Sequence, residues 1–207
     1  PTRRITVNLG PADLPKDGGR FGLPIALGIL AASGQIRREA LAEYEFLGEL
    51  SLTGELRAVD GVLPAALAVA ATGRTLVVPE PSGAEAALAQ QGRACTGRTL
   101  LEVCALLEGR KVLPAATAPP PLPSSIPDMT DVRGQAHARR ALEVAAAGGH
   151  HLLLIGSPGC GKTLLASRLP GLLPVASDGE AMESAAIASV SGRGLDPARW
   201  RQRPYRA

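Results

Sequence analysis

The feature that most constrains this chain is a segment of eight residues that fills every fixed position of the phosphate-loop pattern G-x-x-x-x-G-K-[ST]. Such a loop works between a buried strand and a helix whose amino end faces the phosphates. The apolar run at residues 151–155 predicts that strand, and residues 162–169, followed by Pro170, predict the helix. The loop consists of Gly156, Ser157, Pro158, Gly159, Cys160, Gly161, Lys162 and Thr163.

The residue types in this loop fit the chemistry of phosphate binding. Its glycines allow backbone conformations closed to other residues and bring successive N–H groups toward the phosphate oxygens. Lys162 neutralises phosphate charge, and the hydroxyl of Thr163 ligates Mg²⁺. We therefore expect residues 156–163 to bind ATP or GTP with Mg²⁺. A chance glycine-rich turn is the alternative, and a Rossmann dinucleotide site is disfavoured because no G-x-G-x-x-G opens the helix.

Composition bounds the class of protein. The 207 residues are 45% hydrophobic, which suffices for one large or two small domains. The longest apolar stretches, at residues 23–32 and 62–71, are too short to cross a bilayer, so we expect no membrane span. The three cysteines form no C-x-x-C pair, which favours a reducing compartment and a cytoplasmic protein. We expect both ends to lie inside folded domains, and a targeting signal before Pro1 stays an open alternative.

Basic residues exceed acidic ones only in the second part of the chain, where residues 128–207 carry 10 against 7. A cluster of arginines near the carboxyl end has only Asp196 as a nearby acid, and it is a candidate nucleic-acid surface. A solvated loop is the alternative, and charge alone favours it. The cluster consists of Arg193, Arg199, Arg201, Arg203 and Arg206.

A proline-rich segment at residues 114–127, with six prolines and no charge, predicts an extended spacer between two domains. We predict a first domain at residues 1–113 and a second at residues 128–207. The first is predicted to be α/β or α+β. Its expected strands lie at residues 4–9, 45–50 and 76–78, and its helices at 23–32, 63–71, 83–90 and 100–107. In the second domain, a helix at residues 135–147 ends at Gly148 and Gly149 before the loop.

The second domain resembles the opening of an AAA+ module of the magnesium-chelatase type. The resemblance rests on Asp-Val-Arg-Gly-Gln at residues 131–135 before a helix, and on Ala-Gly-Gly-His-His-Leu-Leu-Leu-Ile-Gly leading into the phosphate loop. It covers residues 128–207 and implies ATP rather than GTP. It also implies that Val132 and Gln135 lie beside the adenine.

The first domain resembles the carboxy-terminal domain of Lon protease. The matching segments are Pro-Lys-Asp-Gly at residues 15–18, Leu-Thr-Gly-Glu at 52–55 and Val-Val-Pro-Glu at 77–80. Lon-type proteases cleave with a Ser nucleophile and a Lys base. The aligned positions hold Arg20 and Leu63, and neither can do this chemistry, so we expect no peptidase activity.

Together these features resemble the YifB/ComM family of magnesium-chelatase-like ATPases. The family implies a Lon-like α+β domain followed by a P-loop AAA+ α/β module. It also implies a homohexameric ring that binds ATP and Mg²⁺. Such a ring acts on DNA as a branch-moving helicase in natural transformation, and we expect no membrane among its partners. Two alternatives stay open: a motor that drives metal insertion into a porphyrin, and an ATP-binding remnant that does not hydrolyse. The second arises because no Walker B acidic pair or arginine finger is found before Ala207, so we assign no catalytic residue.

Overall fold

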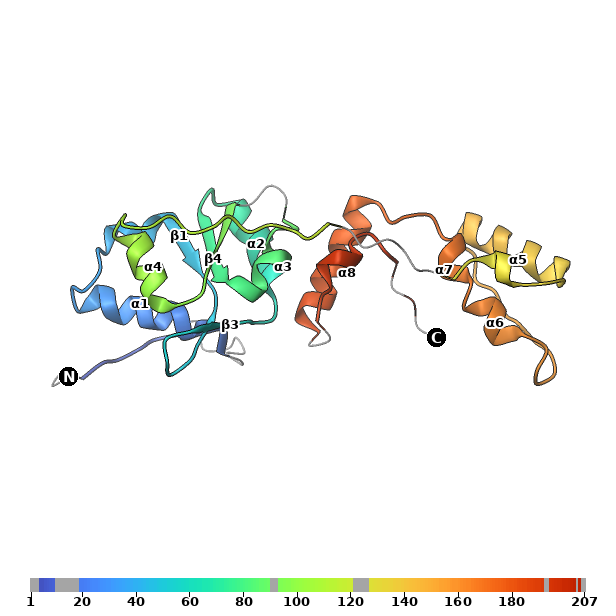
Figure 1. Cartoon of the computed structure of the whole chain (residues 1–207), viewed down its shortest axis with the longest axis horizontal. Coiled ribbons are helices and arrows are strands. Elements are labelled where there is room, and N and C mark those ends of the chain that lie inside the picture. Colours follow the sequence, from blue (N-terminus) through green and yellow to red (C-terminus); the bar gives the residue numbers. More distant parts are fainter. Residues whose placement is uncertain are drawn as a thin grey trace. The chain divides into compact units, whose positions relative to one another are not determined.

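The computed structural model describes residues 4–9, 19–89, 93–120, 127–191, 194–203 and 205. The chain divides into two compact units. Unit 1 comprises Pro1–Pro120 and Ala185–Ala198, and unit 2 comprises Pro121–Ser184 and Arg199–Ala207. Each unit is described by itself, and Figure 1 gives the labels of the elements.

Unit 1 is built on a three-stranded parallel sheet in the order β1-β4-β5. The strands are β1 (Tyr44–Phe46), β4 (Thr75–Pro79) and β5 (Arg93–Gly97). The central strand β4 is paired on both edges, since Val77 lies opposite Phe46 on one side and Cys95 on the other. It is buried from Leu76 onward, as expected for a parallel strand covered on both faces. The architecture is therefore mixed α/β, as predicted, and its three-stranded sheet is parallel.

Helices cover both faces of this sheet (Figure 1). On one face, α1 (Gly22–Ala32) and α4 (Leu100–Leu107) pack against Val77. Because side chains alternate along a strand, Leu76 and Val78 point to the other face, which α2 (Val62–Ala70) covers together with α3 (Gly83–Ala86). The core of the first face is formed by Leu23, Leu27, Ile36, Leu56, Val77, Cys95, Val103, Leu107 and Leu113.

The start of the proline-rich segment is bonded to unit 1. The backbone N–H of Thr96 donates to the carbonyl of Pro114 at 2.9 Å, and that of Ala116 donates to the carbonyl of Ala94 at 2.9 Å. These bonds lie along the free edge of β5. Residues 121–126 of the segment lie outside the described residues.

Unit 2 places a small core beneath the candidate loop. The core consists of Met129, Val132, Leu142 and Leu165, all buried. Its helices are α5 (Ala136–Gly148), α6 (Lys162–Ala166), α7 (Leu169–Leu172) and α8 (Asp178–Val190), and the boundary between the units falls within α8. Unit 2 also contains the short 3₁₀ helix Met129–Asp131.

The remaining elements of unit 1 are the antiparallel pair β2 (Glu49–Leu50) and β3 (Leu56–Arg57) and the short 3₁₀ helices Gly19–Phe21, Glu39–Glu43 and Glu80–Ser82. The 3₁₀ helix Pro197–Arg199 lies at the boundary between the units.

Two helices, one starting in each unit, begin with an N-cap residue whose hydroxyl accepts a backbone N–H of the first turn. Thr99 accepts the N–H of Glu102 at the start of α4, at 3.3 Å. At the start of α8, Ser177 accepts the N–H of Glu180 at 3.3 Å, and the Glu180 carboxylate accepts the N–H of Ser177 at 2.9 Å. The second arrangement is a complete capping box, which satisfies two backbone donors that the helix leaves unpaired.

Two of the predicted strands are wrong. Residues 151–155 form no strand, and Leu153 and Ile155 are 80% and 85% exposed. Residues 4–9 are extended and exposed, but they are paired with no strand of the described chain. The physical reason is the same in both cases. A strand needs a neighbour to take its backbone hydrogen bonds, and no described strand lies beside either segment.

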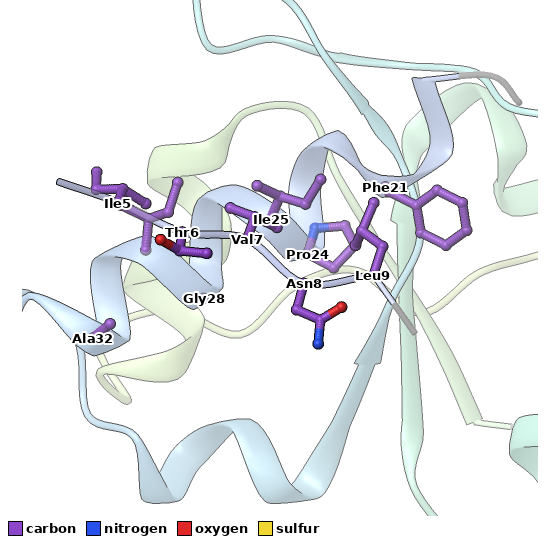
Figure 2. A pocket seen from close by; sticks show the side chains of 11 residues that line it. Ile5, Thr6, Val7, Asn8, Leu9, Phe21, Pro24, Ile25, Gly28 and Ala32 are labelled. Atoms are coloured by element: carbon purple, nitrogen blue, oxygen red, sulfur yellow. The ribbon is translucent and has the colours of Figure 1, made fainter. Parts of the chain in front are cut away.

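The segment at residues 4–9 lies instead along α1, where it encloses an apolar groove of about 360 Å³. Figure 2 shows the groove in unit 1, with side chains from both the segment and the helix around it. Ile5 and Val7 line it from the segment, and Ile25 and Ile29 line it from α1. The alternating polar residues Thr6 and Asn8 line the groove as well, so the alternation that predicted a strand does not separate a buried face from an exposed one.

Most predicted helices are confirmed, with corrections at their ends. The helices at α1, α2, α4 and α5 agree with prediction within one residue at each end. The helix after the phosphate loop ends at Ala166, and Pro170 lies in the first turn of α7, where its missing N–H costs no hydrogen bond. The helix predicted at residues 83–90 shortens to α3, and the strand predicted at residues 45–50 divides into β1 and β2, which belong to different sheets.

No helix in the described part of the chain combines the length and the apolar character that crossing a bilayer requires.

Candidate nucleotide site

The phosphate-loop residues form a turn that leads directly into α6. Gly159 and Gly161 have φ angles of 79° and 86°, in the left-handed region that only glycine enters readily. The loop is also tight, since a Cβ added to Gly156 would come within 2.8 Å of the Cys160 sulfur. The glycines of the sequence pattern therefore meet a geometric need in this chain.

The loop wraps around the ammonium group of Lys162. Nζ of Lys162 donates to the carbonyl oxygens of Gly156 and Ser157 at 2.8 and 2.7 Å, and it lies 3.6 Å from the Cys160 sulfur. The positive charge is thus held at the centre of the loop by acceptors of the loop itself. A phosphate bound there would replace these carbonyls as the partner of the ammonium.

The other candidate residues of the loop lie at its exposed side. Thr163 is exposed in the first turn of α6, next to Lys162. Ser157 and Pro158 are also exposed. The described residues contain no group of three or more His, Cys, Asp or Glu side chains that could hold a metal ion. A hydroxyl at this position is the donor set expected for a Mg²⁺ ion held mainly by nucleotide phosphates.

The structure brings Gln135 to the loop and places Val132 in the core of unit 2. The side-chain amide of Gln135 donates from Nε2 to the carbonyl oxygen of Cys160 at 2.8 Å. Val132 is 4% exposed and packs in the core of unit 2 with Leu165 of α6. Gln135 therefore contacts the loop itself, and Val132 contacts the helix that follows it.

An ion pair that the sequence did not reveal also joins the segment at residues 131–135 to Arg168, which lies between α6 and α7. Nη2 of Arg168 lies 3.0 Å from Oδ2 of Asp131, and Nη1 donates to Oγ of Ser167 at 2.9 Å. The Arg168 side chain is only 16% exposed, and its Nε is buried without a protein partner. Asp131 opens the recognised segment, but Arg168 belongs to no motif, so no sequence signal pointed to the pair.

The two positions aligned with a protease dyad lie in unit 1. Arg20 approaches Gly61, where an added Cβ would lie 3.3 Å from Nη1 of the guanidinium. Leu63 is fully buried, and its backbone N–H donates to Oε1 of Glu85 at 2.9 Å. The two positions thus hold a cation and a buried apolar side chain. The Pro-Lys-Asp-Gly segment at residues 15–18 lies outside the described residues.

The candidate nucleic-acid surface is partly neutralised inside unit 2. Arg203 forms an ion pair with Glu180 at 3.0 Å, and Arg201 lies 3.4 Å from Asp178. Arg193 and Arg206 lie outside the described residues. Arginines that already hold carboxylates are less available to phosphates, so this geometry adds no support to a basic surface.

The chain resembles known proteins over its whole length. The family model "Magnesium chelatase, subunit ChlI" matches residues 128–207, and "Subunit ChlI of Mg-chelatase" matches residues 1–82. Competence protein ComM of Haemophilus influenzae is 50% identical over the full chain, which covers 42% of that protein. The YifB proteins of Salmonella typhimurium and Escherichia coli are 48% and 47% identical, also over the full chain and 41% of each relative.

A mixed α/β chain with a phosphate-loop sequence and matches of this kind defines a class, that of the magnesium-chelatase-like proteins. Within it, the chain belongs to the YifB/ComM family. The chain spans about two fifths of the length of the curated relatives it matches, at 41–42% of each.

Proposed function

We propose that this chain binds Mg-ATP at residues 156–163. The observation that carries the proposal is the Lys162 ammonium held inside a loop that turns at two left-handed glycines, Gly159 and Gly161, of which Gly161 occupies a fixed position of the phosphate-loop pattern. An ammonium surrounded by exchangeable carbonyl acceptors is a binding site for an anion with several oxygens. The proposal makes Lys162 the main cationic partner of the phosphates.

The loop residues have separate roles in binding. Backbone N–H groups of the loop donate to phosphate oxygens, and Lys162 neutralises their charge. Thr163 would ligate Mg²⁺, which supplies further positive charge at the phosphates. Asp131, Gln135 and Arg168 hold the surrounding segments in place without an obvious role in the chemistry itself.

Calorimetry with Mg-ATP tests the binding proposal. The Lys162→Ala variant is expected to lose measurable binding, because no other lysine lies in unit 2. Lys111→Ala is the matched control, since Lys111 belongs to unit 1 and is paired there with Glu102 at 2.6 Å. Equal binding by the parent and Lys162→Ala would show that the loop is not the nucleotide site.

We further propose that the whole protein is an ATP-driven motor that acts on branched DNA as a homohexameric ring. The support is the resemblance to ComM, a protein named for competence, to which this chain is 50% identical over 100% of its residues. The test is ATP turnover by the whole protein with single-stranded, duplex and branched DNA. Branched DNA is expected to raise the rate of ATP turnover more than single-stranded or duplex DNA does. A rate that is the same with and without DNA would count against the proposal.

A chelatase motor is the second candidate, because both matching family models carry the name of a magnesium-chelatase subunit. It would drive insertion of a metal ion into a porphyrin. This candidate would be favoured over the first if metal insertion required the whole protein and ATP, and if DNA did not change the rate of ATP turnover.

A further inference from the structure

The side chain of Gln135 contacts the phosphate loop. Its Nε2 lies 2.8 Å from the carbonyl oxygen of Cys160, a residue 25 positions later in the chain. The same nitrogen lies 3.4 Å from the place where a Cβ on Gly161 would stand. Gln135 therefore touches the last two residues of the loop before Lys162.

The bond to Cys160 fixes the direction of a neighbouring N–H group. In a trans peptide the C=O of one residue and the N–H of the next point to opposite sides. A donor that holds the Cys160 carbonyl therefore aims the Gly161 N–H away from Gln135. That N–H is one of the groups that a phosphate loop offers to its ligand.

The backbone at Gln135 has an unusual conformation that this contact helps to explain. Its φ is 53°, and Arg201 is the only other non-glycine residue with a positive φ in the described part of the chain. Side chains other than glycine rarely adopt this region, and such residues persist where the surroundings hold them. Here the hydrogen bond that the side-chain amide donates to the Cys160 carbonyl holds the side chain at the point where the chain turns into α5.

A second contact ties the start of the same segment to Arg168, two residues beyond the end of α6. The ion pair between Asp131 and Arg168, at 3.0 Å, joins the start of the segment to the residues after α6. Between the two ties, Val132 packs with Leu165 in the core. The segment at residues 131–135 is thus fixed at both ends against the loop and its helix.

We propose that Gln135 is a positioning residue for the phosphate loop, acting through the Cys160 carbonyl on the phosphate end of the ligand rather than on its base. This inference rests on the proposed nucleotide-binding function. It assigns Gln135 a different role from the adenine contact that the family resemblance implies. The two roles predict different responses to a ligand that has phosphates and no base.

Inorganic tripolyphosphate provides that ligand. The Gln135→Met variant keeps an unbranched side chain of similar length and removes the donor. It is expected to weaken Mg-ATP and tripolyphosphate binding by the same factor, about three- to tenfold, which corresponds to one lost hydrogen bond. Gln35→Met is the matched control, since Gln35 is an exposed, hydrogen-bonded glutamine of unit 1, and it should bind both ligands like the parent.

Hydrogen exchange separates positioning from a general loss of structure. In Gln135→Met, amides of the loop at residues 157–163 should exchange faster while those of α5 stay as protected as in the parent. The Gln135→Glu variant, which places a carboxylate beside a carbonyl oxygen, should give the same pattern. Faster exchange throughout α5 in both variants would mean that Gln135 only supports the fold, and it would overturn the proposal.

The binding results are equally decisive. Loss of Mg-ATP binding with unchanged tripolyphosphate binding would show that Gln135 contacts the base, and unchanged binding of both would leave it without a role; either result overturns the inference. A parent chain that binds neither ligand would refute the proposed nucleotide function itself. In that case the exchange rates of the loop in Gln135→Met still decide whether Gln135 positions it.

Discussion

Two apolar runs of similar composition lie in different units, and only one of them is a strand. Leu76, Val77 and Val78 of unit 1 form the centre of β4 and are at most 2% exposed. Residues 152–155 of unit 2 read Leu-Leu-Leu-Ile, form no strand, and expose Leu153 and Ile155 by 80% and 85%. The two sequences alone would suggest the same structure.

The difference lies in the neighbours of each run. β1 and β5 take the backbone hydrogen bonds of β4 on both edges, and helices cover both of its faces. No described strand lies beside residues 152–155. An apolar run therefore states only that a segment favours burial, and the ladder partners decide whether it becomes a strand.

The same substitution in both runs gives the largest expected contrast. Leu76→Ala should lower the free energy of unfolding of unit 1 by about 2–5 kcal/mol, because it leaves a cavity beside the sheet. Leu153→Ala should change stability by less than about 0.5 kcal/mol. Urea unfolding followed by hydrogen exchange of peptides from each unit measures both. If Leu153→Ala lowered the free energy of unfolding by about 2 kcal/mol or more, which is about the smallest cost of truncating a buried leucine, residues 152–155 would be buried in solution.

The cysteines provide a second contrast between the units. Burial raises the pKa of the Cys95 thiol to about 11 and also raises that of Cys104, where Glu108 adds to the effect. At pH 8 a thiol with a pKa near 11 is only about one part in a thousand thiolate, which is the reactive form. Cys160 is exposed in the loop.

Iodoacetamide should therefore label Cys160 at least about tenfold faster than Cys95 at pH 8. Mass spectrometry of the labelled peptides measures the rates, and Mg-ATP should slow the labelling of Cys160 alone. Preferential labelling of Cys95 or Cys104 would contradict the contrast between the more buried thiols of unit 1 and the exposed Cys160 of unit 2.

The two helix caps give the smallest contrast. Thr99→Ala and Ser177→Ala should each cost about 1 kcal/mol of stability, with exchange of the first-turn amides of α4 and α8 as the local readout. Thr99→Ser and Ser177→Thr keep a hydroxyl and serve as controls. Equal exchange in the alanine variants and the parent would mean that the caps do not hold in solution.

The caps also predict a response to acid. Hydrogen bonds from the Ser177 backbone and hydroxyl, with further help from Arg203, lower the pKa of Glu180, and the bond from Lys111 is the main cause that lowers the pKa of Glu102. A carboxylate with a lowered folded pKa stabilises above its unfolded pKa, and that stability is lost as the pH falls through the folded value. Both helix starts should therefore loosen below about pH 4, near the ordinary pKa of glutamate.

Local signals were enough to predict part of the molecule. The apolar stretches of α1, α2 and α4 and the alanine-rich run of α5 predicted helices because helical periodicity is a property of a single segment. The loop glycines were recognised because their conformation is needed within eight consecutive residues.

Features that depend on distant residues could not be predicted. β5 reads Arg-Ala-Cys-Thr-Gly, which carries little strand signal, and it is a strand because β4 and Pro114 pair with it. The contact between Gln135 and Cys160 spans 25 residues, and that between Asp131 and Arg168 spans 37. No spacing rule links such positions before the chain is folded.

The two carbonyls that hold Lys162 set a condition for any ligand of the loop. A ligand that binds the ammonium must replace two short hydrogen bonds, those from Lys162 to the carbonyl oxygens of Gly156 and Ser157. An anion that offers a single oxygen makes an unfavourable exchange, whereas a polyphosphate supplies several oxygens on one molecule. The proposed ligand meets this condition, because its phosphate oxygens can take the place of both carbonyls around the ammonium.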